Sequence, residues 1–207
     1  MEEKNMPFSF YVESTPNPAS VKFIANQTLL QVGASAQYNS INDCSKAPLP
    51  KRLFEFPFVK QVFLSSHYIT ITKHDMVDWY EIISELRVFI TNYLNQGHPL
   101  VEELPSQEVA LDSSFKETKK IYTEHAAPQN ETEVKIIEIL EQYIRPAVEQ
   151  DGGLISFKSF DSGKVTVQMK GSCSGCPSST ITLKSGIEGL LKRLMPDVVK
   201  EVVSEAV

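Results

Sequence analysis

Residues 164–194 read KVTVQMKGSCSGCPSSTITLKSGIEGLLKRL, and this stretch decides the fold of the C-terminal half of the chain. β-favouring residues alternate with polar ones from Lys164 to Lys170, which predicts a strand. Apolar residues at helical spacing then predict a helix from Ser178 to Leu194. Cys173 and Cys176 therefore lie in a short loop between a strand and a helix.

The segments on either side complete a small domain. A helix is predicted from Thr132 to Gln150, with a kink or restart at Pro146 because proline lacks a backbone donor and crowds the preceding turn. The other expected features are a helix stop at Asp151-Gly152-Gly153, a strand from Leu154 to Phe160, a turn at Asp161-Ser162-Gly163 and a last strand from Val198 to Val203. Residues 131–207 thus form an αββαβ domain.

The N-terminal half predicts a second domain, residues 1–99, with the order ββαββα. Its long helix is expected to start with Asp75 as the cap and to bury a stripe that includes Tyr80. The expected elements are strands Phe8–Val12 and Ser20–Ile24, a short helix within 50–56, strands Val59–Leu64 and His67–Thr72, and the helix Asp75–Gln96. Both domains belong to the α+β class, with helices on one face of an antiparallel sheet in the first.

Between the domains, residues 100–130 lose helical and strand periodicity and are predicted to be an acidic flexible linker. Its glutamates, Glu124 among them, are interpreted as solvating charge. Such a tether would let the two domains move independently.

The composition limits the classes of function. Of 207 residues 42% are hydrophobic, and 20 basic against 26 acidic residues give a net charge of −6. Phosphate binding needs a positive field, so no nucleic-acid partner is expected. No segment approaches the roughly 18 apolar residues that span a bilayer, and the N-terminus resembles neither a signal nor a transit peptide. The expected location is the cytoplasm, with no membrane partner.

The chain has three cysteines, Cys44, Cys173 and Cys176, which argues against a disulfide framework and for metal or redox use of the close pair. Two cysteines three residues apart can direct both sulfurs at one soft metal site. Ser178 or Ser179 is expected to cap the following helix, whose positive end favours thiolates. Soft sites of this kind need four protein ligands, so two chains related by a two-fold axis are expected to share one site.

Other interpretations of the close pair remain open. A structural zinc site bridging two chains would accept the same four thiolates, and a dithiol oxidoreductase would also place its cysteines at the start of a helix. Cys44 is interpreted as an incidental thiol. Asp151-Gly152-Gly153 is interpreted as a helix end, and the alternative is that it lines the surroundings of the dimer or cluster. The four histidines all precede the predicted cysteine domain, and surface or strand-end roles are expected for them: His67, His74, His98 and His125. No catalytic constellation is evident, so no enzymatic activity is expected.

The segments Ile144-Arg145-Pro146, Asp151-Gly152-Gly153 and 171–188 resemble the C-terminal domain of NifU, the NifU-like or Nfu scaffold domain. Residues 13–24, with parts of the two following strands, are similar to the N-terminal domain of Nfu proteins. The resemblance implies a homodimeric carrier that receives a [4Fe–4S] cluster, or alternatively [2Fe–2S], from an upstream scaffold and delivers it to apo client enzymes. It implies Cys173 and Cys176 as the cluster ligands.

Overall fold

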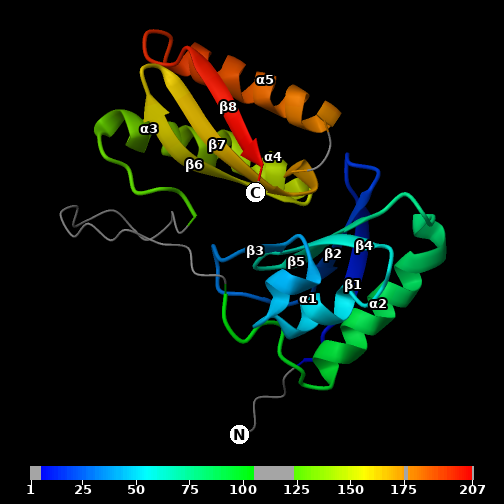
Figure 1. Ribbon diagram of the computed structural model, residues 1–207. Coiled ribbons are helices and arrows are strands. Elements are labelled where there is room, and N and C mark those ends of the chain that lie inside the picture. Colours follow the sequence, from blue (N-terminus) through cyan, green and yellow to red (C-terminus); the bar gives the residue numbers. More distant parts are fainter. Residues whose placement is uncertain (1–5, 105–123, 175–176, 207) are drawn as a thin grey trace, which may run out of the picture. The chain divides into compact units, whose positions relative to one another are not determined.

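The structure is a computed structural model, and it describes residues 6–104, 124–174 and 177–206. The chain divides into two compact units, Met1–Pro105 and Ser106–Val207, which Figure 1 shows in blue to green and in green to red. Each unit is described by itself. Of the predicted linker, residues 105–123 lie outside the described residues.

The N-terminal unit is an antiparallel sheet with the strand order β1-β2-β5-β4-β3. Its strands are β1 (Phe10–Ser14), β2 (Ser20–Ala25), β3 (Ala36–Tyr38), β4 (Val59–Leu64) and β5 (Tyr68–Lys73). Its helices are the 3₁₀ turn η1 (Ile41–Cys44), α1 (Pro48–Leu53) and α2 (Trp79–Asn95). The predicted order ββαββα is confirmed, with β3 as an additional three-residue strand that is too short to show a period.

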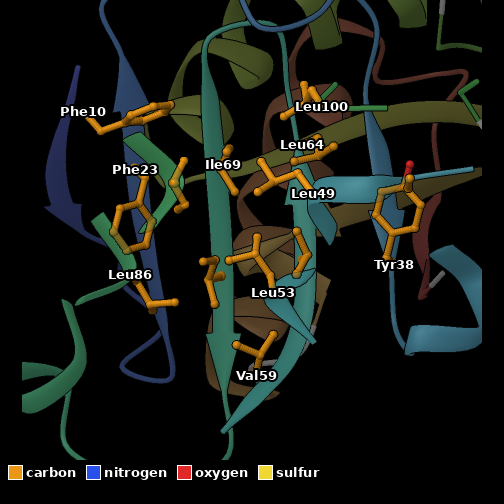
Figure 2. Packing of buried hydrophobic residues seen from close by; sticks show 14 of the residues in the cluster. Phe10, Phe23, Tyr38, Leu49, Leu53, Val59, Leu64, Ile69, Leu86 and Leu100 are labelled. Atoms are coloured by element: carbon orange, nitrogen blue, oxygen red, sulfur yellow. The ribbon is translucent and has the colours of Figure 1, made fainter. Parts of the chain in front are cut away.

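One hydrophobic core joins this sheet to its helices. Figure 2 shows Phe23 of the sheet near Leu86 of α2 and Ile69 of the sheet near Leu49 of α1, and all four belong to one buried cluster. Burial of such apolar area is the dominant favourable term in folding. Leu100 is also buried in this core, and its carbonyl accepts a hydrogen bond from Leu49 N.

The start and the buried stripe of α2 differ from the prediction. Asp78, and not Asp75, is the N-cap, since its carboxylate accepts a hydrogen bond from Tyr80 N at 2.8 Å. Tyr80 is 93% exposed, so its predicted place in the buried stripe is wrong. The helix buries residues at a strict spacing of four: Ile82, Leu86, Ile90 and Leu94.

The C-terminal unit has the predicted order αββαβ. Its helices are α3 (Glu131–Ile139), the π-helical turn η2 (Leu140–Ile144), α4 (Arg145–Gln150), the 3₁₀ turn η3 (Ser172–Ser174) and α5 (Pro177–Leu194). Its strands are β6 (Gly153–Asp161), β7 (Lys164–Gly171) and β8 (Glu201–Ala206). The order in the sheet is β6-β7-β8, with β6 antiparallel and β8 parallel to β7 (Figure 1). α5 is therefore a crossover helix between two parallel strands.

Pro146 explains the π-helical turn. Proline removes one backbone donor and its ring crowds the carbonyl four residues earlier, so a regular α-helix cannot continue through it. The wider turn at Leu140–Ile144 absorbs this defect, and α4 starts beside Pro146. The predicted restart is thus confirmed.

The last strand begins later than predicted. Val198 N and Val199 N both donate to Met195 O, so the chain is still turning where Val198–Val203 was expected to be extended. Lys200 N then donates to Gly163 O at 2.7 Å, and β8 starts at Glu201. Gly163 in turn closes the β6–β7 hairpin together with Ser162, with φ of 92° and 51°, the pattern of a type I′ turn.

We expect Gly163→Ala to lower the free energy of unfolding of the C-terminal unit by about 1–2 kcal/mol. A Cβ at this left-handed residue would lie 2.9 Å from side-chain atoms of Lys200 and 3.2 Å from Val198 O. Gly189→Ala is the control, because a Cβ there meets nothing within 4 Å and alanine favours helix by up to about 1 kcal/mol. Hydrogen exchange of the slowest amides in β7 measures the free energy of unfolding in both variants. Equal protection in the two variants would contradict the prediction.

Candidate functional site

The cysteine loop lies between the carboxyl end of β7 and the start of α5, as predicted. Gly171 ends the strand with a φ of 70°, and Ser172–Ser174 form the 3₁₀ turn η3 that contains Cys173. Gly175 and Cys176 lie outside the described residues. The pairing of Cys173 with Cys176 therefore stays a prediction.

Cys173 is packed against the first residue of β6. The residue is 4% exposed and belongs to the core of the C-terminal unit. A Cβ placed on Gly153 would lie 2.7 Å from Cys173 Sγ and 2.8 Å from Lys170 O. Only a residue without a side chain allows this approach. Gly153 therefore sets the position of the sulfur.

The rest of the Asp151-Gly152-Gly153 motif is hydrogen-bonded to the same loop. Gly152, with a φ of 78°, ends α4 by donating from its N to Glu149 O at 3.0 Å. The Ser172 hydroxyl donates to Asp151 O, and Ser172 N donates to Gly152 O at 3.2 Å. The motif was predicted to be a helix end, with a place in the surroundings of the dimer or cluster as the alternative. It is a helix end and also the cradle of Cys173, a function that its two adjacent glycines could have signalled.

The helix after the loop begins at Pro177. Ser178 and Ser179 therefore lie inside its first turn, and the prediction that one of them is the N-cap is wrong. Proline is common at the first helical position, because its missing N–H is one that has no intrahelical acceptor. Of the lysines on the two flanking elements, Lys170 at the end of β7 is buried and Lys184 of α5 is half-buried.

Lys170, at the end of β7, is a buried lysine with 6% of its surface exposed. Burial lowers the pKa of its ammonium group, while the carboxylate of Glu124 raises it. Glu124 is itself buried, and no hydrogen-bond partner for its carboxylate oxygens occurs among the described residues. Its interpretation as solvating charge is wrong, because Glu124 lies in the folded unit beside Lys170.

The histidines divide into two kinds. His67, His74 and His98 are exposed residues of the N-terminal unit, which agrees with the predicted surface roles. The expectation for His125 is wrong, since its side chain is 1% exposed in the cysteine-containing unit. Its Nδ1 accepts a hydrogen bond from Phe157 N at 2.7 Å, so tertiary contact buries it.

Cys44 belongs to the N-terminal unit and has different surroundings from Cys173. It is 1% exposed in the core of the N-terminal unit, and its Sγ donates to Ser40 O at 3.4 Å. Burial, with a smaller contribution from Asp43, raises the pKa of its thiol to about 11. Such a thiol is a poor ligand and a poor nucleophile at neutral pH.

Within residues 6–104, 124–174 and 177–206, no group of three or more His, Cys, Asp and Glu side chains is arranged to hold a metal ion. In the same part of the chain, no helix combines the length and the apolar character that crossing a membrane requires.

Both halves of the chain match known protein families. The model described as "Scaffold protein Nfu/NifU N terminal" matches residues 10–97, and the one described as "NifU-like domain" matches residues 136–203. The chain therefore belongs to the NifU-like, or Nfu, family of scaffold proteins.

Curated relatives align over most of the chain. "NifU-like protein 4, mitochondrial" of Arabidopsis thaliana is 38% identical over 90% of this chain and 62% of its own length. "NFU1 iron-sulfur cluster scaffold homolog, mitochondrial" of Drosophila willistoni is 36% identical over 94% and 63%. "NifU-like protein 5, mitochondrial" of Arabidopsis thaliana is 35% identical over 95% and 68%. The chain thus spans less than two thirds of the length of the first two.

These names correct one expectation. A cytoplasmic location was expected, but the similar relatives are named as mitochondrial proteins, so that expectation is wrong. The physical reason is that a compartment is encoded in targeting segments, which are separate from the folded domains and leave no trace in their packing.

We expect Gly153→Ala to displace Cys173 and to destabilise the C-terminal unit by about 1–3 kcal/mol, since the new methyl group must push away a sulfur and a backbone carbonyl. Hydrogen exchange in β6 and β7 reports the stability, and the alkylation rate of Cys173 reports its displacement. Gly186→Ala is the control, because a Cβ there meets nothing within 4 Å. Unchanged exchange and unchanged alkylation would refute the role of Gly153.

Proposed function

We propose that this chain carries an iron–sulfur cluster between two copies of itself, held by Cys173 and Cys176 of each, and passes it to apo-proteins. The observation that carries the proposal is the Gly153 cradle, which fixes Cys173 in the turn that precedes α5 within a NifU-like domain. The name of the Drosophila relative, an iron-sulfur cluster scaffold homolog, supports the same role.

The number of ligands supports a shared site. A [4Fe–4S] cluster takes about four cysteine ligands, whereas this chain has two at close spacing. The described residues of one chain supply no other set that could complete the site. Two copies related by a two-fold axis supply four thiolates, and a [2Fe–2S] cluster would satisfy the same count.

Transfer requires no oxidant and no reductant. Each iron–thiolate bond to the carrier is exchanged for a bond to a thiolate of the acceptor, so the cluster moves as an intact unit and its oxidation state is conserved. Cluster receipt from an upstream scaffold is the same exchange in reverse. We assign the N-terminal unit to docking of donors or client enzymes, and we assign no catalytic activity to the chain.

The burial of Cys173 argues against the dithiol oxidoreductase. A thiol that attacks a protein disulfide must be exposed, and Cys173 is 4% exposed. A cluster carrier is compatible with this burial, because thiolates that hold a cluster between two copies are shielded from solvent by the cluster and the second copy. A zinc-bridged dimer would use the same four thiolates, and metal analysis separates it from the cluster.

We expect anaerobic reconstitution to give a brown protein with about two irons per chain for [4Fe–4S], or about one for [2Fe–2S]. Cys173→Ser and Cys176→Ser each remove the iron, because one lost ligand per chain removes two from the shared site. Cys44→Ala is the matched control and keeps full iron. Iron, sulfide and zinc analysis with Mössbauer spectra gives the readout. Colourless, iron-free protein with intact thiols would reject the proposal, and stoichiometric zinc would favour the structural dimer.

The dimer is tested on the outer side of α5. Ile181 follows Pro177 by one turn and is 66% exposed, so we expect Ile181→Asp to place two like charges near the two-fold axis and to prevent dimerisation on cluster loading. Leu194→Asp is the control, since Leu194 is 45% exposed at the far end of the same helix. Anaerobic sedimentation of reconstituted protein measures both. A dimer of Ile181→Asp with full iron would exclude this face from the interface.

A further inference from the structure

The start of the C-terminal unit contains a buried contact that the cysteine chemistry does not use. Residues 124–126, here called the strap, precede the matched NifU-like domain and lie along β6. Ala126 N donates to Phe157 O at 2.9 Å, and Phe157 N donates to His125 Nδ1 at 2.7 Å. β6 is an edge strand, so the strap occupies both outward backbone groups of Phe157.

These contacts fix the state of the His125 ring. Because Nδ1 accepts a hydrogen bond from Phe157 N, the N–H proton of the ring is on Nε2. Nε2 lies 2.5 Å from Glu141 Oε1, which therefore accepts that proton's hydrogen bond. His125 thus joins the edge of β6 to the π-helical turn η2.

A chain of charges continues from Glu141 along the helix. Arg145 Nε lies 2.6 Å from Glu141 Oε1, as an ion pair whose angles do not make a well-aligned hydrogen bond. Arg145 Nη1 lies 3.6 Å from Glu149 Oε1. Glu149 stands just before Asp151-Gly152-Gly153, which holds Cys173. The strap is therefore connected through packed side chains to the cradle.

The strap also acts on the other side of the loop. Glu124 interacts electrostatically with Lys170, the residue before Gly171, and with Glu149. Its carboxylate raises the pKa of both groups, while burial is the largest cause of shift in each. The charge of Glu124 thus acts on residues at the ends of β7 and α4, while His125 is hydrogen-bonded to β6 and η2.

We propose that the strap positions the cysteine site: His125, through Glu141 and Arg145, holds the end of α4 so that Gly153 stays against Cys173. This inference deepens the proposed function, and only the use of the positioned Cys173 as a cluster ligand rests on that function. The positioning itself is a property of the cluster-free chain. Glu124 assists from the Lys170 side.

The test uses the reduced, cluster-free full chain. N-ethylmaleimide is added in pulses, and peptide mass spectrometry gives a separate rate for each cysteine. In His125→Ala we expect Cys173 to react about tenfold faster, because loss of the hydrogen bonds of a buried group opens the cradle locally. Cys44, buried in the other unit, is the internal control and keeps its rate.

Two further variants separate positioning from general destabilisation. Val199→Ala removes part of a core side chain that is 2% exposed in the same unit. Because valine has no polar side-chain atom, this variant lowers stability without removing a hydrogen bond or ion pair of the strap. Compared at equal stability of the unit, it should leave Cys173 slow. His125→Asn keeps an acceptor for Phe157 N and is expected to restore most of the protection. If His125→Ala unfolds, Glu141→Gln takes its place. This variant removes the charge that Arg145 contacts, and it is also expected to make Cys173 react faster.

Equal Cys173 rates in His125→Ala and Val199→Ala, at equal stability, would overturn the strap as a positioning element. This outcome is independent of cluster binding. If wild-type protein fails to bind a cluster but Cys173 responds as described, the proposed function fails and the strap stands. If the cluster binds but the Cys173 rates of His125→Ala and Val199→Ala are equal, the proposed function stands and the positioning role of the strap fails.

Discussion

The contact between Gly153 and Cys173 is the constraint on which the C-terminal unit depends. A sulfur that would lie 2.7 Å from any Cβ at this position demands glycine there, and the hydrogen bonds of Ser172 to Asp151 and Gly152 hold the two segments at that distance. The end of α4, the start of β6 and the end of β7 therefore meet at one point. Cys173 therefore belongs to the core of this unit.

The position of this loop follows from the topology of the sheet. β7 and β8 are parallel and α5 crosses between them, so the loop leaves the carboxyl end of a parallel strand and enters the start of a helix. Open α/β sheets bind their ligands at such ends, where backbone donors and the positive end of a helix converge. The same geometry suits an anionic centre.

Local patterns in the sequence predicted much of this structure, and contacts between distant residues account for what was missed. Val59–Leu64 coincides with β4, and the glycine of Asp161-Ser162-Gly163 marks the I′ turn, because both signals depend on adjacent residues. Tyr80 was placed on the buried side because two stripes of apolar residues run along α2, and only packing selects between them. His125 is buried by a partner 32 residues away, which no period reveals. The Cys173 loop was predictable, whereas its cradle required the pairing of Gly153 with Gly171 across the hairpin.

The occupied edge of β6 has a consequence for solubility. A strand at the edge of a sheet exposes backbone groups with which a strand of another chain can pair. His125 and Ala126 satisfy both outward groups of Phe157 with a segment of the same chain. Two copies of the protein at high concentration therefore cannot pair edge to edge through Phe157 of β6.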